Sequence, residues 1–404
     1  MSSREKRVVR LAYLVSHPIQ YQSPLLRLVA KESWLDLTVL YASNISVALF
    51  RDPEFKKVIS WDVPILGGYR HEFLPALGRA DRLGFFRPFV YGLKRRFREN
   101  DFDVIWVHGW GRLSHIVAIF LARRYGIKVL LRGESALHLS RHGFFKQWMK
   151  ERFLCWLFNR VDKFLAIGKL NRDFYQHYGI PAERIFMMPY AVDNAFFQEQ
   201  AHHAEAGRAA LRSELRLKPD RPIFLFASKM IDRKRAEDVI DAFIGLSQGE
   251  QEEPNAYLLF VGDGDQRVVL EQRAARLGWD AIRFLGFKNQ TELSAYYDLC
   301  DAFVLPSVEE PWGLVVNEVM NAGRAVIVSD EVGCHPDLVK DGVNGYVFRA
   351  GDVVSLRTAL SKVVHDLPRC RMMGRESREI IATFSFQEDI VGLRQAINSA
   401  MGTP

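Results

Sequence analysis

The chain has 404 residues, of which 48% are hydrophobic and 25% charged; at roughly 150 residues per domain this allows two globular domains and excludes collagen-like, extensively disordered and multi-spanning membrane proteins. The net charge of +7 is unevenly divided, since residues 1–200 hold 31 Lys and Arg against 18 Asp and Glu, whereas residues 201–404 hold 24 against 30. The basic half predicts a polyanionic partner: nucleic acid, an anionic membrane surface or a phosphorylated ligand.

The cysteines and the N-terminal segment predict an intracellular setting. Cys155, Cys300, Cys334 and Cys370 are scattered without metal-ligand spacing, which indicates free thiols in a reducing compartment. The basic first ten residues lead into a short apolar strand rather than a signal-peptide core, and no apolar run approaches the ~20 residues of a membrane span. We therefore expect a cytoplasmic protein and leave peripheral association with the inner face of the membrane open.

Short apolar runs alternate with helical patterns along the whole chain. The runs are apolar on both alternating faces, which is typical of parallel strands covered on both sides. In the first half we expect strands at 10–16, 35–41, 103–108, 128–131, 163–167 and 184–188. In the second half we expect them at 222–227, 256–261, 283–285, 302–305, 325–329 and 345–348.

This alternation occurs twice and predicts an α/β chain of two doubly wound, Rossmann-like domains. We place one domain at 1–196 and the other at 222–385. A polar connection with one short helix is expected at 197–221, and a closing helix at 386–404 that packs back on the first domain. Ligands of such folds bind at the carboxyl ends of the strands, so the two sheets are expected to face each other across a cleft.

A carboxylate pair follows the strand predicted at 302–305. Glu310 lies in the loop after the strand, and Glu318 lies inside the helix that Gly313 opens. The backbone N–H groups of Gly313, Leu314 and Val315 would form a phosphate cradle at the positive end of this helix. Two acceptors beside an anion site suit a nucleotide-sugar, whereas the alternative is a solvated loop charge and a helix-surface charge.

The block from 301 to 348 resembles the signature of the retaining glycosyltransferases of family four, which have the GT-B fold. The resemblance rests on two Glu with seven residues between them, on the Pro-Ser before them, and on the Asp-Gly-x-x-Gly at 341–345. Arg324 departs from the family, which usually has Pro there. The resemblance implies that Glu310 orients the donor sugar and that Glu318 binds the ribose.

Two cations follow the strand predicted at 222–227. Lys229 and Lys234 would form charge-assisted hydrogen bonds to a diphosphate, although from the residues alone a solvated basic turn is the better explanation. The family has Arg at the first of these positions, so Lys229 keeps the charge but not the bidentate fork. The resemblance implies that both bind the donor diphosphate.

Two glycine turns follow the next strands. Asp263 and Asp265 form an Asp-x-Asp that binds metal in another class of glycosyltransferases, but the strand–Gly–helix context favours a tight turn that binds none. We therefore expect no metal and no cofactor. The resemblance implies that Gly286 and Phe287 meet the nucleobase, with a UDP-sugar favoured as the donor and a GDP-sugar as the second choice.

Several polar residues follow strands of the first half. His108 ends a predicted strand, and a cleft-facing His at this place occurs in many family members, although a structural His is the alternative. One loop contains His17, Gln20 and Tyr21, and another contains Arg132 and Glu134. Both loops offer groups suited to a sugar acceptor. Ordinary turn chemistry explains both loops nearly as well.

The basic surplus gathers in two segments, 93–98 and 141–160. The second interleaves Lys and Arg with Phe and Trp at helical spacing, which indicates either a helix resting on anionic lipid or a core helix with a solvated basic side. The usual nucleic-acid-binding motifs are not found in the sequence, so a nucleic-acid partner is not expected.

Taken together with the resemblance to family four, these patterns predict a retaining, metal-independent glycosyltransferase of the hexosyltransferase type. It would move a sugar from a nucleotide-sugar to a saccharide or a polyprenyl-diphosphate-linked acceptor, in the biosynthesis of cell-surface polysaccharides or glycoconjugates. Glu310 and His108 are its predicted catalytic residues. A nucleotide-sugar epimerase of the same fold and a non-catalytic nucleotide-sugar-binding protein are the alternatives.

Overall fold

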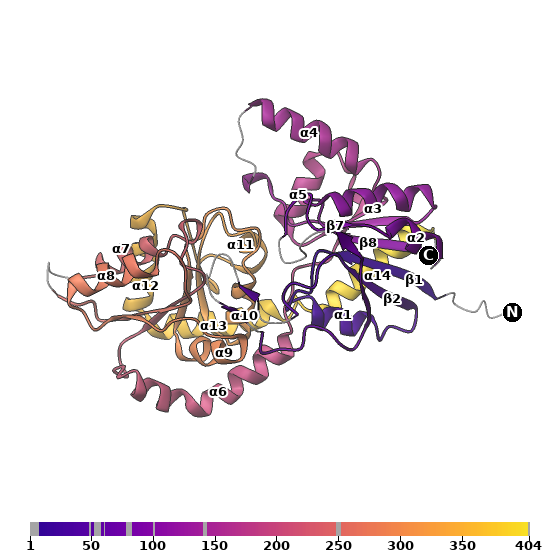
Figure 1. The fold of residues 1–404 in the computed structure, drawn as a ribbon. Coiled ribbons are helices and arrows are strands. Elements are labelled where there is room, and N and C mark those ends of the chain that lie inside the picture. The colour runs from indigo at the N-terminus through magenta and orange to yellow at the C-terminus, as the bar shows by residue number, and fades with distance from the viewer. Residues whose placement is uncertain are drawn as a thin grey trace. The chain divides into compact units, whose positions relative to one another are not determined.

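The computed structural model describes residues 8–47, 50–51, 58–59, 61–77, 83–99, 102–139, 144–247 and 252–402. The chain divides into two units (Figure 1). Unit 1 consists of Met1–Phe50, Val63–Tyr190 and Phe386–Pro404, and unit 2 of Arg51–Asp62 and Ala191–Ser385. Both units are α/β, and each is built on a parallel sheet.

Unit 1 has a seven-stranded parallel sheet in the order β11-β10-β9-β8-β1-β2-β5. Its strands are β1 (Val9–Val15), β2 (Leu35–Tyr41), β5 (Arg70–Phe73), β8 (Val104–His108), β9 (Lys128–Arg132), β10 (Lys163–Ala166) and β11 (Ile185–Met187). Its helices are α1 (Ser23–Val29), α2 (Leu93–Glu99), α3 (Leu113–Arg124), α4 (Phe144–Phe158), α5 (Lys169–His177) and α14 (Phe386–Met401), with 3-10 turns at Leu137–Leu139 and Ala182–Arg184. The strand order reverses between β1 and β8, which is the switch point of the sheet.

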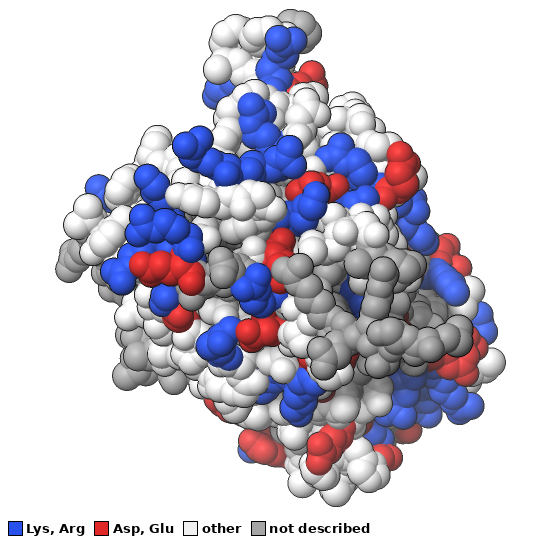
Figure 2. All heavy atoms as spheres, turned by 90° about the vertical axis from the view of Figure 1, so that its right-hand side faces the viewer, with Lys and Arg blue, Asp and Glu red and all other residues white. Residues whose placement is uncertain are grey.

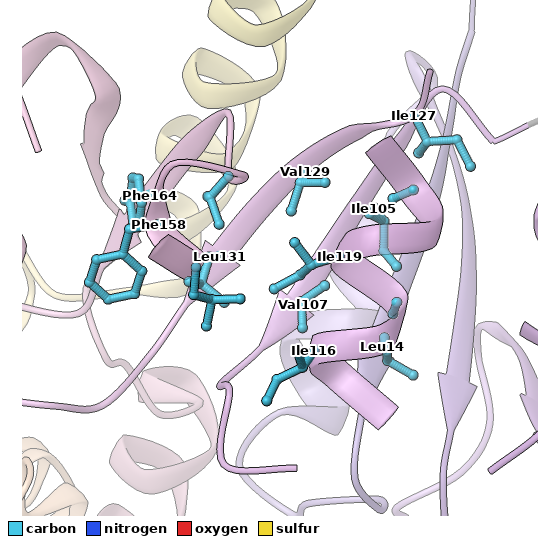
Figure 3. Packing of buried hydrophobic residues seen from close by; sticks show 14 of the residues in the cluster. Leu14, Ile105, Val107, Ile116, Ile119, Ile127, Val129, Leu131, Phe158 and Phe164 are labelled. Carbon is cyan, nitrogen blue, oxygen red and sulfur yellow. The ribbon is translucent and has the colours of Figure 1, made fainter. Parts of the chain in front are cut away.

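The core of unit 1 forms where α3 covers this sheet. Ile116 and Ile119 of α3 lie over Val107 of β8 and over Val129 and Leu131 of β9 (Figure 3). The strand side chains are fully buried, and each buried aliphatic side chain stabilises the fold by roughly 1.5–3 kcal/mol relative to an exposed one. The apolar runs of the sequence therefore become the covered strands that their composition predicts.

Unit 2 has a six-stranded parallel sheet in the order β14-β13-β12-β15-β16-β17, with its switch point between β12 and β15. Its strands are β12 (Ile223–Ala227), β13 (Tyr257–Val261), β14 (Ile282–Phe284), β15 (Ala302–Leu305), β16 (Ala325–Ser329) and β17 (Gly345–Phe348). Its helices are α6 (Asn194–Glu214), α7 (Ala236–Ile244), α8 (Arg267–Leu277), α9 (Gln290–Leu299), α10 (Leu314–Asn321), α11 (His335–Leu338), α12 (Val353–His365) and α13 (Leu367–Ile381), with a 3-10 turn at Asp232–Lys234.

The structure contains strands that the sequence patterns did not predict. β5 extends the edge of the first sheet with the sequence Arg-His-Glu-Phe, whose side chains are exposed or half-buried and so show no apolar run. Two small sheets add β3 (Phe50–Arg51) with β4 (Val58–Ile59) and β6 (Ala76–Leu77) with β7 (Phe89–Val90). Strands of two residues are too short for a sequence period to reveal.

The segment at 197–221 also differs from the expectation of one short helix, because α6 is 21 residues long. Asp193 caps α6 by accepting a hydrogen bond from the Phe196 backbone N–H at 3.1 Å, and Ala, Glu and Arg sustain the helix. α6 packs along α9, and Arg208 of α6 donates hydrogen bonds to the Asp298 carboxylate of α9 at 2.7 Å and 2.5 Å. The last helix, α14, lies against β9, β10 and β11 of unit 1.

Candidate active site

The switch point of unit 2 brings together residues that are far apart in the sequence. β12 and β15 are parallel neighbours, so the loops that follow them leave the sheet at the same edge. Lys234 follows β12 and Glu310 follows β15, and the Lys234 Nζ donates a hydrogen bond to Glu310 Oε2. Both residues are 8% exposed. Glu310 is therefore a paired carboxylate inside the edge of the sheet rather than a solvated loop charge.

Backbone contacts fix the loop that carries Glu310. The Val308 N–H donates to the carbonyl of Arg233 at 2.8 Å, which joins the two loops at the switch point. The Glu310 carbonyl accepts from the Gly333 N–H at 2.9 Å. A Cβ on Gly333 would lie 2.0 Å from the Pro311 carbonyl oxygen, so only glycine permits this approach. The carboxylate is thus held in place by the backbone on both sides.

Glu318 lies on α10 and is also buried, with 2% exposure. Its Oε2 accepts a hydrogen bond of 2.6 Å from the Tyr297 hydroxyl of α9. Gly313 precedes α10 with φ of +93°, and Leu314 and Val315 form the first turn, where backbone N–H groups point out of the helix end. The structure thus excludes a helix-surface role for Glu318 and places it in the second turn of α10.

Lys229 is half-buried in the loop directly after β12. This loop packs against the Gly-Asp-Gly turn after β13, where the Met230 N–H donates to the Asp263 carbonyl at 2.9 Å. A Cβ on Gly262 would lie 2.0 Å from the Ser228 carbonyl oxygen, which explains the glycine at this position. Asp263 accepts hydrogen bonds from the Gly264 N–H at 2.9 Å and from Arg267 at 3.0 Å.

Gly286 and Phe287 follow β14 at the same edge of the sheet. The Gly286 carbonyl accepts from the Gly262 N–H at 2.8 Å, so the turn after β14 is tied to the turn after β13. Gly286 has φ of +74°, and both residues are half-buried. The loops that carry all the predicted donor residues therefore leave one edge of one sheet.

A second polar cluster lies at the switch point of unit 1. His108 ends β8, and its Nδ1 lies 3.2 Å from the hydroxyl of Tyr13 on β1. The Gln22 side-chain nitrogen lies 3.1 Å from His108 Nε2, and the Tyr13 hydroxyl donates to the Gln22 oxygen at 2.5 Å. The Glu134 carboxylate lies 3.2 Å from His108 Nε2. His108 thus joins groups from the carboxyl ends of β1, β8 and β9.

Glu134 is the exposed member of this cluster, with 43% side-chain exposure. It accepts a hydrogen bond from the Tyr190 hydroxyl. Its surroundings would by themselves raise the pKa by desolvation, but the hydrogen bonds from His108 and Tyr190 and the charge of Arg132 together lower the pKa below its ordinary value. Glu134 therefore presents a charged hydrogen-bond acceptor to solvent.

Arg132 does not reach solvent, contrary to its predicted contact with an acceptor. Its side chain is 1% exposed and donates to the carbonyls of Met188 at 2.9 Å and Pro189 at 3.0 Å, and to Asp389 Oδ1 of α14 at 3.2 Å. Its guanidinium carbon lies 4.8 Å from the centroid of the Tyr190 ring. Arg132 therefore contacts the Tyr190 ring and the backbone before it from inside the protein and does not contact solvent.

His17, Gln20 and Tyr21 lie half-buried on the loop between β1 and α1. His17 Nδ1 lies 2.8 Å from the Ser16 hydroxyl. Burial, followed by the charges of Arg112 and His108, lowers the pKa of His17 to about 4, so the ring is neutral at pH 7. The loop thus offers neutral hydrogen-bonding groups near His108.

The sequence patterns missed three members of the unit 1 cluster: Tyr13, Gln22 and Tyr190. Tyr13 lies inside an apolar strand and reads as a core residue, and the signal for Gln22 was only its position near Gln20. Tyr190 follows β11, and no local spacing connects it with Glu134. Only the strand order of the sheet brings these residues together.

Two family models match consecutive parts of the chain. The model described as Glycosyltransferase Family 4 matches residues 45–196, and the model described as Glycosyl transferases group 1 matches residues 207–380. The chain belongs to glycosyltransferase family four. The second match contains Lys229, Lys234, Glu310 and Glu318, and the first contains His108, Arg132 and Glu134.

Curated relatives of this family-four chain carry out different reactions. The D-inositol 3-phosphate glycosyltransferase of Nocardia farcinica is 28% identical over 235 residues, which cover 57% of this chain and 51% of that protein. The glycogen synthase of Mycobacterium tuberculosis is 25% identical over 295 residues, which cover 70% and 66% of the two chains. The chain thus matches only part of the length of these relatives.

Solved structures show that the chain has the GT-B fold of glycosyltransferases. Sucrose-phosphate synthase from Thermosynechococcus elongatus superposes with a TM-score of 0.74 at 19% identity, covering 98% of this chain and 99% of the other. HepE from Anabaena, in complex with UDP, superposes with a TM-score of 0.69 at 16% identity, with the same coverage. At these identities the likeness concerns the fold.

Proposed function

We propose that this glycosyltransferase takes its sugar from a nucleotide-sugar bound by unit 2 and transfers it to an acceptor bound by unit 1. The observation that carries the proposal is the buried contact between Lys234 and Glu310 at the switch point of the unit 2 sheet. A carboxylate and an ammonium group that are buried together cost desolvation energy, so a pair at a ligand-binding edge is more readily explained by function than by stability.

The donor diphosphate would lie between the two lysines and the first turn of α10. Lys229 and Lys234 supply positive charge, and the N–H groups at Gly313, Leu314 and Val315 supply hydrogen bonds at the positive helix end. Glu318 would accept the two ribose hydroxyls, and Gly286 and Phe287 would contact the base. The complexes of HepE with UDP and with UDP-glucose support a UDP-sugar as the donor; a GDP-sugar is the second choice.

The reaction we propose is retaining and needs no metal. The bond between the anomeric carbon and the diphosphate oxygen breaks, and the bond from the acceptor oxygen forms on the same face of the sugar. The acceptor proton passes to the leaving diphosphate, whose negative charge Lys229 and Lys234 stabilise. Glu310 accepts hydrogen bonds from sugar hydroxyls and fixes the orientation of a hexose. His108 forms a hydrogen bond to the donor sugar or its phosphate.

We propose that Glu134, His17, Gln20 and Tyr21 bind the acceptor, a saccharide or a polyprenyl-diphosphate-linked saccharide. The charged Glu134 and the neutral His17 both suit sugar hydroxyls, which donate and accept hydrogen bonds. Arg132 serves as a positioning residue for Glu134. Such a reaction belongs to the biosynthesis of cell-surface polysaccharides or glycoconjugates.

The test has two stages. Thermal shift across UDP-, GDP- and ADP-sugars identifies the donor, because a ligand stabilises the folded state by mass action. Product analysis with that donor, with and without added saccharides and with a chelator, then examines the reaction. Acceptor-dependent transfer with an unchanged anomeric configuration and no loss on chelation supports the proposal. Isomerised donor without acceptor would indicate an epimerase, and binding without turnover would indicate a binding protein.

A further inference from the structure

Helix α4 has two apolar faces, of which only one is covered. Leu154, Leu157 and Phe158 are buried, and the Phe158 ring packs against Phe164 and Trp110 with centroids 5.2 Å and 5.3 Å apart. This face anchors the helix to unit 1. In Figure 1 the end of α4 that lies away from these buried residues projects from the rest of unit 1.

The uncovered face of α4 carries large apolar side chains. At about 100° of rotation per residue, Phe145, Trp148, Met149, Phe153 and Trp156 share one stripe about 140° wide, opposite the buried face. Their exposed fractions run from 70% for Phe145 through 53% for Met149 to 37% for Phe153. We call these five residues together with Arg152 the α4 outer face. Helices that are apolar on all sides are normally buried, so this face indicates a partner.

The charges around the α4 outer face are basic. Arg152 lies within the stripe, with its guanidinium carbon 5.9 Å from the Trp148 ring, and Arg160 lies 4.4 Å from the Trp156 ring. Lys146 is exposed at the border of the stripe. Glu151 is the one acidic residue of α4, lies on the covered side and accepts a hydrogen bond from Gln147 at 2.9 Å. Blue Lys and Arg spheres also gather around the projecting helix in Figure 2.

The second basic segment, α2, differs from α4. Arg95 forms an ion pair with Glu99 at 2.9 Å, and Arg96 forms one with Glu72. The buried residues of α2 are Leu93 and Phe97, and its remaining side chains are polar. Two of the four cations of α2 thus have acidic partners, and α2 has no second apolar face, so the binding surface lies on α4.

We propose that the α4 outer face binds an anionic lipid bilayer, with the aromatic side chains in the headgroup region and the cations on lipid phosphates. Trp and Phe next to Lys and Arg are the combination that interfacial helices use. In the part of the chain that the structure describes, none of the helices has the length and hydropathy of a membrane span. Contact with a second copy through the same face would bring Lys146, Arg152 and Arg160 of both chains together, which like-charge repulsion opposes.

The test measures flotation of the whole chain, without donor, on vesicles of phosphatidylcholine with about 30% phosphatidylglycerol and on phosphatidylcholine alone. The wild type should bind the anionic vesicles. Phe145→Ser with Trp148→Ser should weaken binding by at least about tenfold, and Lys146→Ser with Arg152→Ser by about fivefold or more on anionic vesicles only. Val268→Ser with Val269→Ser is the matched control, because these valines are 60% and 65% exposed on α8 of unit 2.

A second readout is measured on the wild type and needs only conservative aromatic substitutions for comparison. Lipids with brominated acyl chains should quench the tryptophan fluorescence of the wild type, and Trp148→Phe with Trp156→Phe should remove most of that quenching. The proposal is overturned if all variants float like the wild type, or if the wild type does not bind anionic vesicles. A dimer that Phe145→Ser with Trp148→Ser dissociates, without vesicle binding, would assign the face to a second copy. Donor binding, measured separately, should be unchanged in every α4 variant.

Discussion

Unit 1 and unit 2 each hold a cation and a carboxylate together at the carboxyl edge of a parallel sheet. In unit 1, Arg132 and Asp389 are each 1% exposed, and two backbone carbonyls also accept from Arg132. In unit 2, the side chains of Lys234 and Glu310 are 10% and 11% exposed. The first pair is enclosed by the fold, whereas the second keeps some exposure to solvent, and we propose that this difference separates a structural pair from one that takes part in ligand binding.

The largest effect is expected from Glu310→Gln in unit 2. The neutral amide keeps the shape but loses the charge that pairs with Lys234, so we expect transfer to fall by about 100- to 1,000-fold. Steady-state kinetics with the identified donor measures this. Glu309→Gln is the matched control, because Glu309 is the exposed neighbour in the same loop and should keep wild-type activity.

The equivalent change in unit 1 should act on stability. Arg132→Met leaves Asp389 buried without its cation, and removing one partner of a buried pair costs about 3–5 kcal/mol of the free energy of unfolding. Denaturant titration measures the loss. Arg124→Met is the control, since Arg124 is exposed at the end of α3. Equal stability of the two variants would contradict the contrast between the pairs.

Sequence patterns predicted the site residues of unit 2 better than those of the unit 1 cluster. Glu310 and Glu318 lie in one short segment at the spacing of the family signature, and Lys234 follows Lys229 by five residues as in the family pattern, so the sequence could nominate all three. In unit 1, by contrast, Glu134 and Tyr190 are 56 residues apart in the sequence, and Arg132 and Asp389 are 257 residues apart. Strand order places them together, and Arg132 accordingly resembled a surface ligand until its burial was known.

The same distinction holds for the fold. β2, β15, β16 and β17 occupy the residues that their apolar runs predict, because a strand covered on both sides leaves a strong pattern. β5 lies at a sheet edge with polar side chains, so its place depends on pairing with β2 rather than on composition. Long-range pairing is the part of the fold that local sequence does not carry.

Stability should also depend on pH through Asp389. Burial raises the pKa of Asp389 to about 7, although Arg132 opposes the rise. Because the folded state holds this proton more tightly than the unfolded state, the free energy of unfolding should fall by roughly a few kcal/mol as pH rises from about 4 to about 7. Asp389→Asn should flatten the dependence of the free energy of unfolding on pH, measured by denaturant titrations at several pH values. An unchanged dependence would contradict this role of Asp389.

Glu318→Gln should weaken donor binding by about tenfold, because an amide is a poorer acceptor for the ribose hydroxyls than a carboxylate. Isothermal titration calorimetry with the donor measures this. Glu379→Gln is the control, since Glu379 lies on α13 of the same unit and on its exposed side. Unchanged affinity in a folded Glu318→Gln chain would remove Glu318 from the site.

The smallest effect is expected from Tyr190→Phe in unit 1. Loss of its hydrogen bond to Glu134 should let the pKa of Glu134 rise and should raise the KM for the acceptor by about threefold, with the donor affinity unchanged. Tyr91→Phe, an exposed tyrosine of unit 1, is the control. A change in donor affinity instead would show that the unit 1 cluster is not confined to the acceptor.

The most direct test of the donor site in unit 2 is the affinity of the Lys234→Met chain for the nucleotide-sugar that stabilises the wild type, measured by isothermal titration calorimetry. A lysine that contacts the diphosphate should give a loss of about tenfold or more, with Arg375→Met, an exposed arginine of unit 2, at the wild-type value. A folded Lys234→Met chain with wild-type affinity would contradict the assignment of this edge as the donor site.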